Sequence, residues 1–225
     1  MKSTFCLAAI IALGAASLYA QDSEEHMPVN LGFKIGIPVT DMFSASNTSA
    51  FGGQNQLSGS PFSSAVPRYE FGVSGEFRLP KHLRFEVDGL FKRGGFDSAL
   101  PFAGATAYRP TTFNAWEIPG LFKYNFSLGH MRPFVDFGAS LRHISTLNET
   151  DFLPGVGIAQ LSDNSIALHN RNSFGGVAGF GVSFKKGPLT FTPEARYTRW
   201  ANESFQYSGF RTNLDQGDVL LGITF

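Results

Sequence analysis

The chain has 225 residues, with 18 basic and 18 acidic side chains and a formal net charge of zero. This balance gives no reason to expect nucleic acid or another polyanion as a partner. The single cysteine, Cys6, lies near the N-terminus, so a disulfide framework is excluded. A chain of this length fits one domain.

The first twenty residues have the pattern of a secretory signal peptide. Lys2 supplies a positive charge, an apolar run extends from Phe5 to Leu18, and the small residue Ala20 closes the segment. The run is short for a membrane-spanning helix. The sequence therefore predicts a cleaved signal peptide over residues 1–20 and a short N-terminal segment over residues 21–29.

From residue 30 onward, eight short stretches alternate apolar with polar side chains. The first three run from Asn30 to Val39, from Tyr69 to Leu79 and from Leu83 to Lys92. The other five follow in chain order over residues 116–126, 135–142, 175–185, 189–198 and 218–225. A period of two is typical of strands whose two faces meet different media. Residues 30–225 are therefore predicted to form one eight-stranded antiparallel domain.

Long and short connections alternate between these strands. The long ones cover residues 40–68, 94–111, 144–172 and 201–215, and the short ones cover 80–82, 127–132 and 186–188. This order places all short turns at one end. Outer-membrane barrels have short periplasmic turns and longer extracellular loops, so we expect four long extracellular loops.

The size of the side chains decides which face points outward. An eight-stranded barrel can surround an apolar ligand or present its apolar face to lipid. Its interior is only just wide enough to be filled by side chains, so it cannot hold several large apolar residues from every strand. The other face carries glycines such as Gly72 and Gly138, which leave room for charged neighbours. We therefore predict an all-β, up-and-down transmembrane barrel with its apolar face outward and a salt-bridged lumen.

The charged side chains predicted to face the lumen are balanced in sign. Buried charges need partners, and each sign is well represented here. The basic members are Lys34, Arg78, Arg84, Lys92, Lys123, Arg142, Lys185 and Arg196. The acidic members are Glu70, Glu76, Glu86, Asp88, Glu117, Asp136, Glu194 and Asp218.

Aromatic residues gather toward the strand ends. Those near the long connections are Tyr69, Trp116, Tyr197 and Trp200, and those near the short turns include Phe77, Phe126, Phe184 and Phe191. Such clusters are typical of aromatic girdles at the two membrane interfaces.

Three prolines fall within the predicted strands, at Pro38, Pro119 and Pro193. Each removes one donor from the backbone ladder, and a closed barrel offers no free edge at which that loss is harmless. We therefore expect local bulges at these positions.

The last strand places Val219, Leu221, Ile223 and the terminal Phe225 on one face. With this strand, the signal peptide and the eight-strand pattern, residues 29–225 resemble the small outer-membrane β-barrel family, the OmpA/OmpX-like barrels of Gram-negative bacteria. The resemblance implies a monomer in the bacterial outer membrane, surrounded by lipid and lipopolysaccharide. It also implies that the barrel-assembly machinery recognises the C-terminal strand.

One pair of residues suggests catalysis. His143 and Ser145 resemble the His-x-Ser pair of outer-membrane lipid A deacylases, in which an acid orients the histidine. The residues that follow, Thr146 to Asn148, depart from the Asn-Ala-Gly of that family, and the pair lies in an earlier strand. An acid could come only from Glu149 or Asp151 in the following loop. A lipid hydrolase is therefore an alternative hypothesis.

The leading hypothesis is a non-catalytic protein with a structural or adhesive role, binding an unidentified extracellular ligand through its long loops. A narrow channel is a further alternative, because a filled lumen excludes only a wide pore. The five histidines are dispersed, so no metal site is expected, and no cofactor is expected either.

Overall fold

The structure is a computed structural model that describes residues 29–45, 62–64, 69–102, 105–127, 131–153, 157–162, 168–207 and 210–225. The predicted signal peptide lies outside these residues, as does the segment 21–29 except for Val29. Within the described ranges, no helix is long and apolar enough to cross a membrane.

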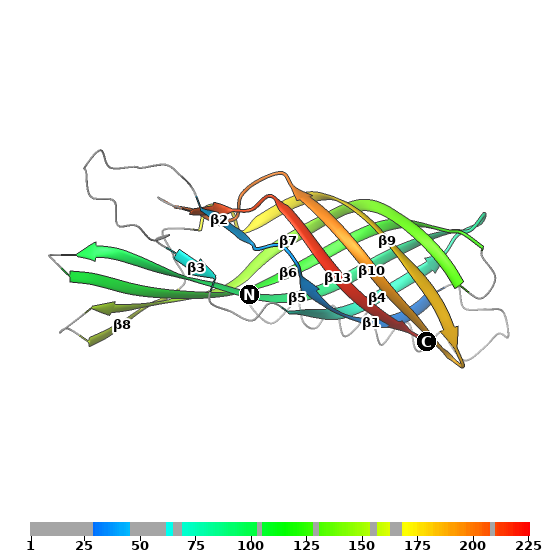
Figure 1. Ribbon diagram of the computed structural model, residues 1–225, viewed down its shortest axis with the longest axis horizontal. Coiled ribbons are helices and arrows are strands. Elements are labelled where there is room, and N and C mark those ends of the chain that lie inside the picture. Colours follow the sequence, from blue (N-terminus) through cyan, green and yellow to red (C-terminus); the bar gives the residue numbers. More distant parts are fainter. Residues whose placement is uncertain are drawn as a thin grey trace.

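Eight antiparallel strands close into one barrel (Figure 1). They are β1 (Val29–Pro38), β4 (Glu70–Arg78), β5 (Leu83–Phe102), β6 (Ala105–Asn125), β7 (Met131–Leu153), β9 (Asn172–Lys186), β10 (Leu189–Trp200) and β13 (Asp215–Thr224). Each of these strands pairs with the next one in the chain, and β13 pairs with β1. The predicted eight-stranded up-and-down barrel is confirmed.

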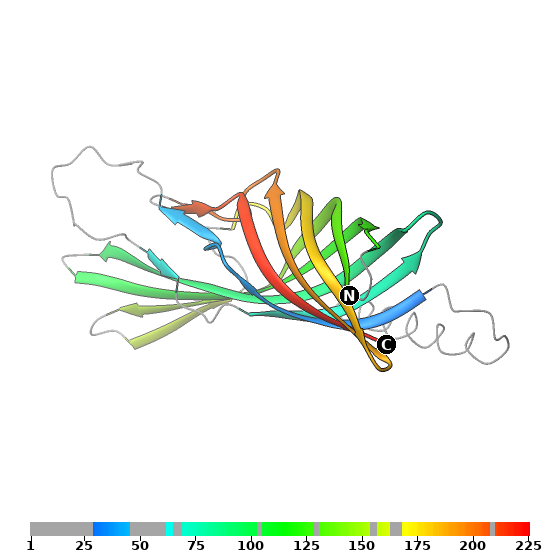
Figure 2. The same cartoon turned by 45° about the vertical axis from the view of Figure 1, so that its right-hand side comes forward.

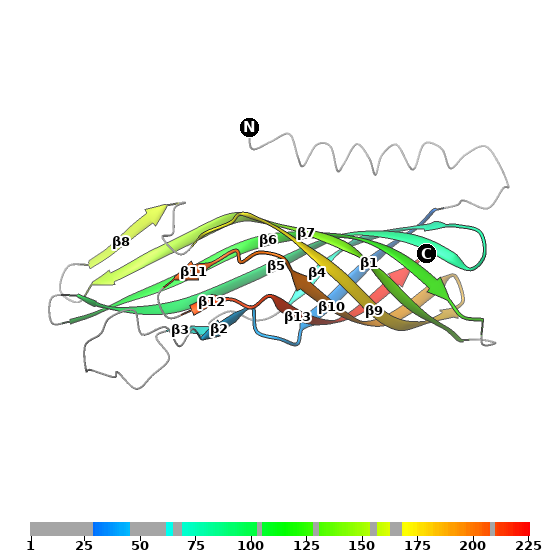
Figure 3. The same cartoon turned by 90° about the horizontal axis from the view of Figure 1, so that it is seen from above.

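Five shorter strands lie among the long connections. They are β2 (Phe43–Ala45), β3 (Phe62–Ser64), β8 (Gly157–Ser162), β11 (Gln206–Tyr207) and β12 (Phe210–Thr212). β3 pairs with β5, and β8 pairs with β7. β2, β12 and β11 form a small separate sheet. All five lie at the end of the barrel opposite the short turns (Figure 3).

Three strands continue well beyond the barrel. β5, β6 and β7 have 20, 21 and 23 residues, whereas a membrane crossing needs roughly 9–11. They run together into a sheet that projects from one end and also includes β8 (Figure 2). We refer to residues 94–102 of β5, 105–114 of β6, 145–153 of β7 and all of β8 as the projecting sheet.

The prediction that residues 94–111 and 144–172 are loops is therefore wrong for much of their length. The reason is that the period-two signal depends on a difference between the two faces of a strand. Beyond the membrane neither face meets lipid, so the alternation fades, while the backbone ladder between paired strands continues.

The strands present their apolar face to the outside of the barrel, as predicted. Phe33, Phe137 and Phe180 are 58%, 63% and 65% exposed on the outer surface. Their polar neighbours in sequence point into the barrel, where Lys34 and Asp136 are buried. Glycine is required where strands approach closely: a Cβ atom at Gly72 or Gly138 would collide with a carbonyl oxygen of the adjacent strand.

The predicted bulges at the prolines are wrong. Pro38 is the last residue of β1, and Pro119 and Pro193 keep their register with β7 and β13 respectively. On the other side of Pro119 and Pro193 the pairing is interrupted without any shift of register. Pro119 and Pro193 are thus accommodated by interrupted pairing on one side, and Pro38 by its place at the end of a strand, rather than by an inserted residue.

The register shift of the barrel lies elsewhere, in β7. Ile144 pairs with Ala115 and Thr146 pairs with Asn114, which leaves Ser145 as an extra residue. This bulge shifts the alternation of inward and outward side chains along β7 by one residue, so that Ile144 and Leu147 both point inward and are buried.

Candidate functional site

The lumen contains two groups of interacting charges, and the first lies toward the long connections. Lys92 is its centre, with its Nζ atom 2.8 Å from Glu70, 2.9 Å from Glu117 and 3.3 Å from Asp218. Arg142 lies 2.9 Å from Glu117 and is buried. We call these five residues the loop-side network. It contains more acidic than basic members, so both cations are needed to offset the carboxylates.

Two uncharged residues complete the surroundings of Arg142. Its guanidinium carbon lies 3.9 Å from the centre of the Trp200 ring, and its Nη2 atom donates to the Oε1 atom of Gln216. The Trp200 indole donates to the same oxygen over 3.2 Å. The Nε2 atom of Gln216 donates to Asp218 over 2.7 Å. Neither Gln216 nor Trp200 was predicted to face the lumen.

The position of Trp200 corrects the predicted girdle. This side chain is only 1% exposed, because residue 200 shares the inward face of β10 with Glu194, Arg196 and Thr198. Trp116 and Tyr197 are 44% and 49% exposed on the outer surface. The other residues predicted for the girdles, Tyr69, Phe77, Phe126, Phe184 and Phe191, also point outward.

The second group of charges lies toward the short turns and is centred on Lys34. The Nζ atom of this lysine is 2.5 Å from Glu86, 3.0 Å from Asp88 and 3.0 Å from Glu194. Arg196 bridges Asp88 and Glu194 at 3.0 and 2.5 Å. These five residues come from β1, β5 and β10, so the contacts join strands across the barrel.

Lys123 and Arg84 extend this group. Lys123 lies 2.6 Å from Glu86 and 3.8 Å from Glu76, and Arg84 also pairs with Glu76. With Glu76, these two residues join the five residues around Lys34, and we call all eight the turn-side network. Its members are Lys34, Glu76, Arg84, Glu86, Asp88, Lys123, Glu194 and Arg196.

Among the described residues, three of the charges predicted for the lumen form no ion pair with a member of either network. Asp136 is buried, but neither of its carboxylate oxygens has a hydrogen-bond partner among the described residues. Arg78 is exposed and donates to Asn30 over 3.3 Å. Lys185 is exposed near the end of β9. The last two lie beside short turns, where the lumen opens to water.

An apolar cluster closes the barrel above the loop-side network. It consists of Phe43, Phe96, Phe113, Ala115, Ile144, Leu147 and Phe205, and we call it the apolar cap. Phe43 is 5.0 Å from Phe96 and 5.6 Å from Phe205 between ring centres, and Phe113 is 4.9 Å from Phe205. Because Phe43 and Phe205 come from long connections, these segments fold over the lumen.

Backbone hydrogen bonds hold the connections together over the cap. The amide of Asn213 donates to Met42 over 2.7 Å, and the amide of His169 donates to Ser204 over 2.8 Å. Leu168 and Phe205 form an isolated antiparallel bridge. The connections that follow β1, precede β9 and follow β10 therefore meet at one place.

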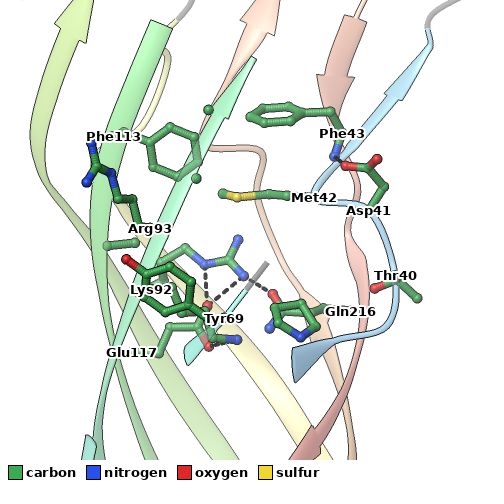
Figure 4. Close-up of a pocket in the computed structure, with 15 residues that line it drawn as sticks. Thr40, Asp41, Met42, Phe43, Tyr69, Lys92, Arg93, Phe113, Glu117 and Gln216 are labelled. Carbon is green, nitrogen blue, oxygen red and sulfur yellow. Dashed lines mark hydrogen bonds and ion pairs between the residues drawn. The ribbon is translucent and has the colours of Figure 1, made fainter. Parts of the chain in front are cut away.

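A cavity of about 60 Å³ separates the cap from the loop-side network. Figure 4 shows Met42, Phe43 and Phe113 on one side of it and Lys92, Glu117 and Gln216 on the other. Such a volume holds a few water molecules at most. Together, the cap and the networks fill the lumen of a narrow barrel.

The two candidate catalytic residues do not form a catalytic arrangement in this structure. The Nδ1 atom of His143 lies 2.7 Å from the Oδ1 atom of Asn172 on β9. The hydroxyl of Ser145 donates to the backbone oxygen of Asn114 over 3.3 Å. The acid candidate Glu149 is buried on the inward face, whereas His143 points outward. The side chain of Asp151 lies outside the described residues.

The four apolar residues of the C-terminal strand all lie on the outward face. Val219 and Phe225 are 52% and 65% exposed, and Leu221 and Ile223 between them are partly exposed. Within the described residues, no group of three or more His, Cys, Asp or Glu side chains is arranged to hold a metal ion.

A closed barrel with an apolar exterior and an ion-paired lumen defines a small outer-membrane barrel protein. The family described as "Outer membrane protein beta-barrel domain" matches residues 19–201. The chain belongs to this family and is a protein of the outer membrane. No curated protein matches the sequence.

Solved structures with a similar course of the chain include other outer-membrane proteins. Neisserial surface protein A is 15% identical, with 88% of this chain and 96% of that chain covered and a TM-score of 0.47. The N-terminal β-barrel domain of Pseudomonas aeruginosa OprF is 10% identical, with 88% and 98% covered and a TM-score of 0.35. Ail, the attachment invasion locus protein of Yersinia pestis, is 10% identical, with 88% and 98% covered and a TM-score of 0.38.

Proposed function

We propose that this protein is a non-catalytic, monomeric outer-membrane barrel that binds a partner outside the cell through the projecting sheet. The observation that carries the proposal is the length of β5, β6 and β7, which is about twice what a membrane crossing requires. Some ten residues of each strand beyond the barrel correspond to about 30 Å. A rigid barrel that holds a paired sheet this far from the membrane is suited to contact a surface or a macromolecule.

The direct test shortens the projecting sheet while the barrel stays intact. Phe96 pairs with Thr111, so residues 97–110 can be replaced by an Asn-Gly turn that joins this pair. Cells that display the original and the shortened protein are applied to an array of immobilised glycans and matrix proteins. We expect the shortened protein to lose binding while it keeps the heat-modifiable gel migration of a folded barrel. Equal binding by both proteins would contradict the proposal.

A filled lumen favours this role over that of a channel. The turn-side network, the loop-side network and the apolar cap succeed one another along the barrel. Conductance of the purified protein in a planar lipid bilayer tests this alternative. We expect no steady conductance, and stable unitary steps would support the channel instead.

The contacts of His143 and Ser145 also speak against the hydrolase alternative. Each residue bonds to a neighbouring strand rather than to the other. Incubation with lipopolysaccharide should therefore release no fatty acid. Release that is abolished by His143→Ala would contradict the non-catalytic proposal.

A further inference from the structure

A concave site lies on the outward face of β5, β6 and β7, where these strands leave the barrel. Its volume is about 220 Å³. The residues that line it are Tyr69, Phe91, Arg93, Thr112, Phe113, Asn114, Thr146 and Asn148. Most of them are brought together by strand pairing, because Arg93 pairs with Asn114 and Asn114 pairs with Thr146. None of the residues that line this rim cavity is a member of the two charge networks, and three of them, Tyr69, Arg93 and Phe113, also line the cavity beneath the apolar cap.

The polar part of the rim cavity consists of hydrogen-bond donors around a cation. Arg93 is exposed, and among the described residues it has no ion-pair partner. Asn114 and Asn148, with side-chain amides, and Thr112 and Thr146, with hydroxyls, line the same cavity. Among the described residues that line the cavity there is no carboxylate. A guanidinium fork beside neutral donors matches an anion that carries several oxygens, and phosphate is an abundant biological anion of this kind.

An aromatic strip adjoins the rim cavity on the side of the membrane. Ring centres of Tyr69 and Phe71 are 6.2 Å apart, those of Phe71 and Phe91 are 5.3 Å apart, and those of Phe91 and Trp116 are 5.3 Å apart. The outward side chain before Arg93 on β5 is Phe91, and the one after Asn114 on β6 is Trp116. Within two residues along each strand, the outward face thus changes from polar to aromatic. Such a change is typical of the membrane interface, where the lipid headgroups lie.

The bulge in β7 lies beside the same cavity. Ser145 is the extra residue, and its hydroxyl donates to the backbone oxygen of Asn114, which is a cavity residue. Bulges bend a strand and redirect its side chains, and they occur preferentially beside functional sites. The bulge gives the outward face here a local curvature that regular strands would not have.

We propose that the rim cavity binds the phosphate group of an outer-leaflet glycolipid, with Arg93 as its principal ligand. The acyl chains of that lipid lie along the aromatic strip from Tyr69 to Trp116. A lipid phosphate is favoured over free phosphate because the cation and the strip are adjacent, so one molecule contacts both. This site lies at the base of the projecting sheet, and replacement of residues 97–110 retains every residue that lines it, so the two binding roles can be tested separately.

The test uses the purified full-length barrel in detergent and two probes, lipid A with both phosphates and the same lipid without phosphate. Native mass spectrometry measures the dissociation constant of each. We expect the phosphorylated lipid to bind more tightly, and Arg93→Gln to weaken its binding by at least about tenfold, since hydrogen bonds to charged groups contribute that much. Asn148→Ala should weaken it less, because a neutral donor is lost.

Arg199→Gln is the matched control, because Arg199 is also an exposed arginine but is paired with Asp215. This variant should bind phosphorylated lipid A as the original protein does. Equal binding of the two lipids, or equal binding by Arg93→Gln and the original protein, would overturn the proposal. Displacement of the lipid by an equal concentration of inorganic phosphate would also overturn it, since the strip would then contribute nothing.

Discussion

At the level of single side chains, the lumen depends on a small number of cations that each hold several carboxylates. Lys92 contacts three of them and Lys34 contacts three others. A buried carboxylate without a positive partner is strongly unfavourable. The loss of one of these lysines therefore leaves more uncompensated charge than the loss of one carboxylate does.

The substitution Lys92→Met tests this asymmetry. It leaves Glu70, Glu117 and Asp218 with Arg142 as the remaining cation of the network, and we expect it to destabilise the barrel by about 3–5 kcal/mol. Urea unfolding of the protein refolded into lipid vesicles measures the change. A second substitution, Glu70→Gln, should restore part of the stability in the Lys92→Met background. If it lowers the stability further, the attribution to uncompensated charge is wrong.

Two glycines offer a test of strand packing. A Cβ atom at Gly138 would collide with the carbonyl oxygen of Gly120, whereas one at Gly176 would meet nothing within 4 Å. Gly138→Ala should therefore destabilise the barrel by about 1–3 kcal/mol, as overpacking does elsewhere. Gly176→Ala should leave the midpoint of urea unfolding unchanged or raise it slightly. Similar midpoints for both variants would mean that the close approach at Gly138 relaxes easily.

At the level of strands, the sequence pattern is informative only where the two faces of a strand meet different surroundings. Phe33 and Lys34, or Phe137 and Asp136, differ because one contacts lipid and the other lies in the lumen. Within the membrane this difference made all eight strands predictable. Beyond the membrane it disappears, so the strands through residues 94–111 could not be recognised from alternation.

Contacts between distant residues were not predictable for a different reason. Lys34 meets Glu194, 160 positions later in the chain, and this pairing depends on the register and tilt of several strands. The apolar cap depends on Phe43 and Phe205, which are aromatic residues within mainly polar connections. Period-two alternation carries no information about such a residue, although a lone phenylalanine among serines and asparagines is a weak signal of burial.

The apolar cap can be tested as an element that closes the barrel. Ala115 is a member of the cap and is 1% exposed, and the only natural cysteine lies in the predicted signal peptide, so Ala115→Cys gives a single reporter. A membrane-impermeant maleimide should label this cysteine slowly. The added substitution Phe205→Ala should speed the labelling, because it removes a ring that contacts three other phenylalanines.

The exposed Ala201→Cys serves as the control for the reagent and should be labelled quickly with or without Phe205→Ala. Fast labelling of Ala115→Cys in the presence of Phe205 would show that the cap is open in solution. The barrel would then have to be closed by the two charge networks alone.

At the level of the whole molecule, β5 shows the order in which the turn-side network, the loop-side network and the apolar cap follow one another along the barrel. From the short turn outward, its inward side chains belong to the turn-side network at Glu86 and Asp88, to the loop-side network at Lys92 and to the apolar cap at Phe96. On the outer surface, the same strand passes from lipid-facing Phe91 to Arg93 of the rim cavity. The barrel is thus solid inside, and its contacts with other molecules are left to the outer surface and the projecting sheet.

The two tryptophans test this description of inside and outside, because one lies on each side of the barrel wall. Trp116 is 44% exposed toward lipid and Trp200 is 1% exposed beside Arg142. In vesicles of brominated lipid, the fluorescence of the Trp200→Phe variant, which retains Trp116, should be strongly quenched. The Trp116→Phe variant, which retains Trp200, should be almost unaffected by brominated lipid and also by acrylamide in the water. Strong quenching of Trp200 by the lipid would place its ring in the outer girdle and would contradict its contact with Arg142 and its hydrogen bond to Gln216 in the lumen.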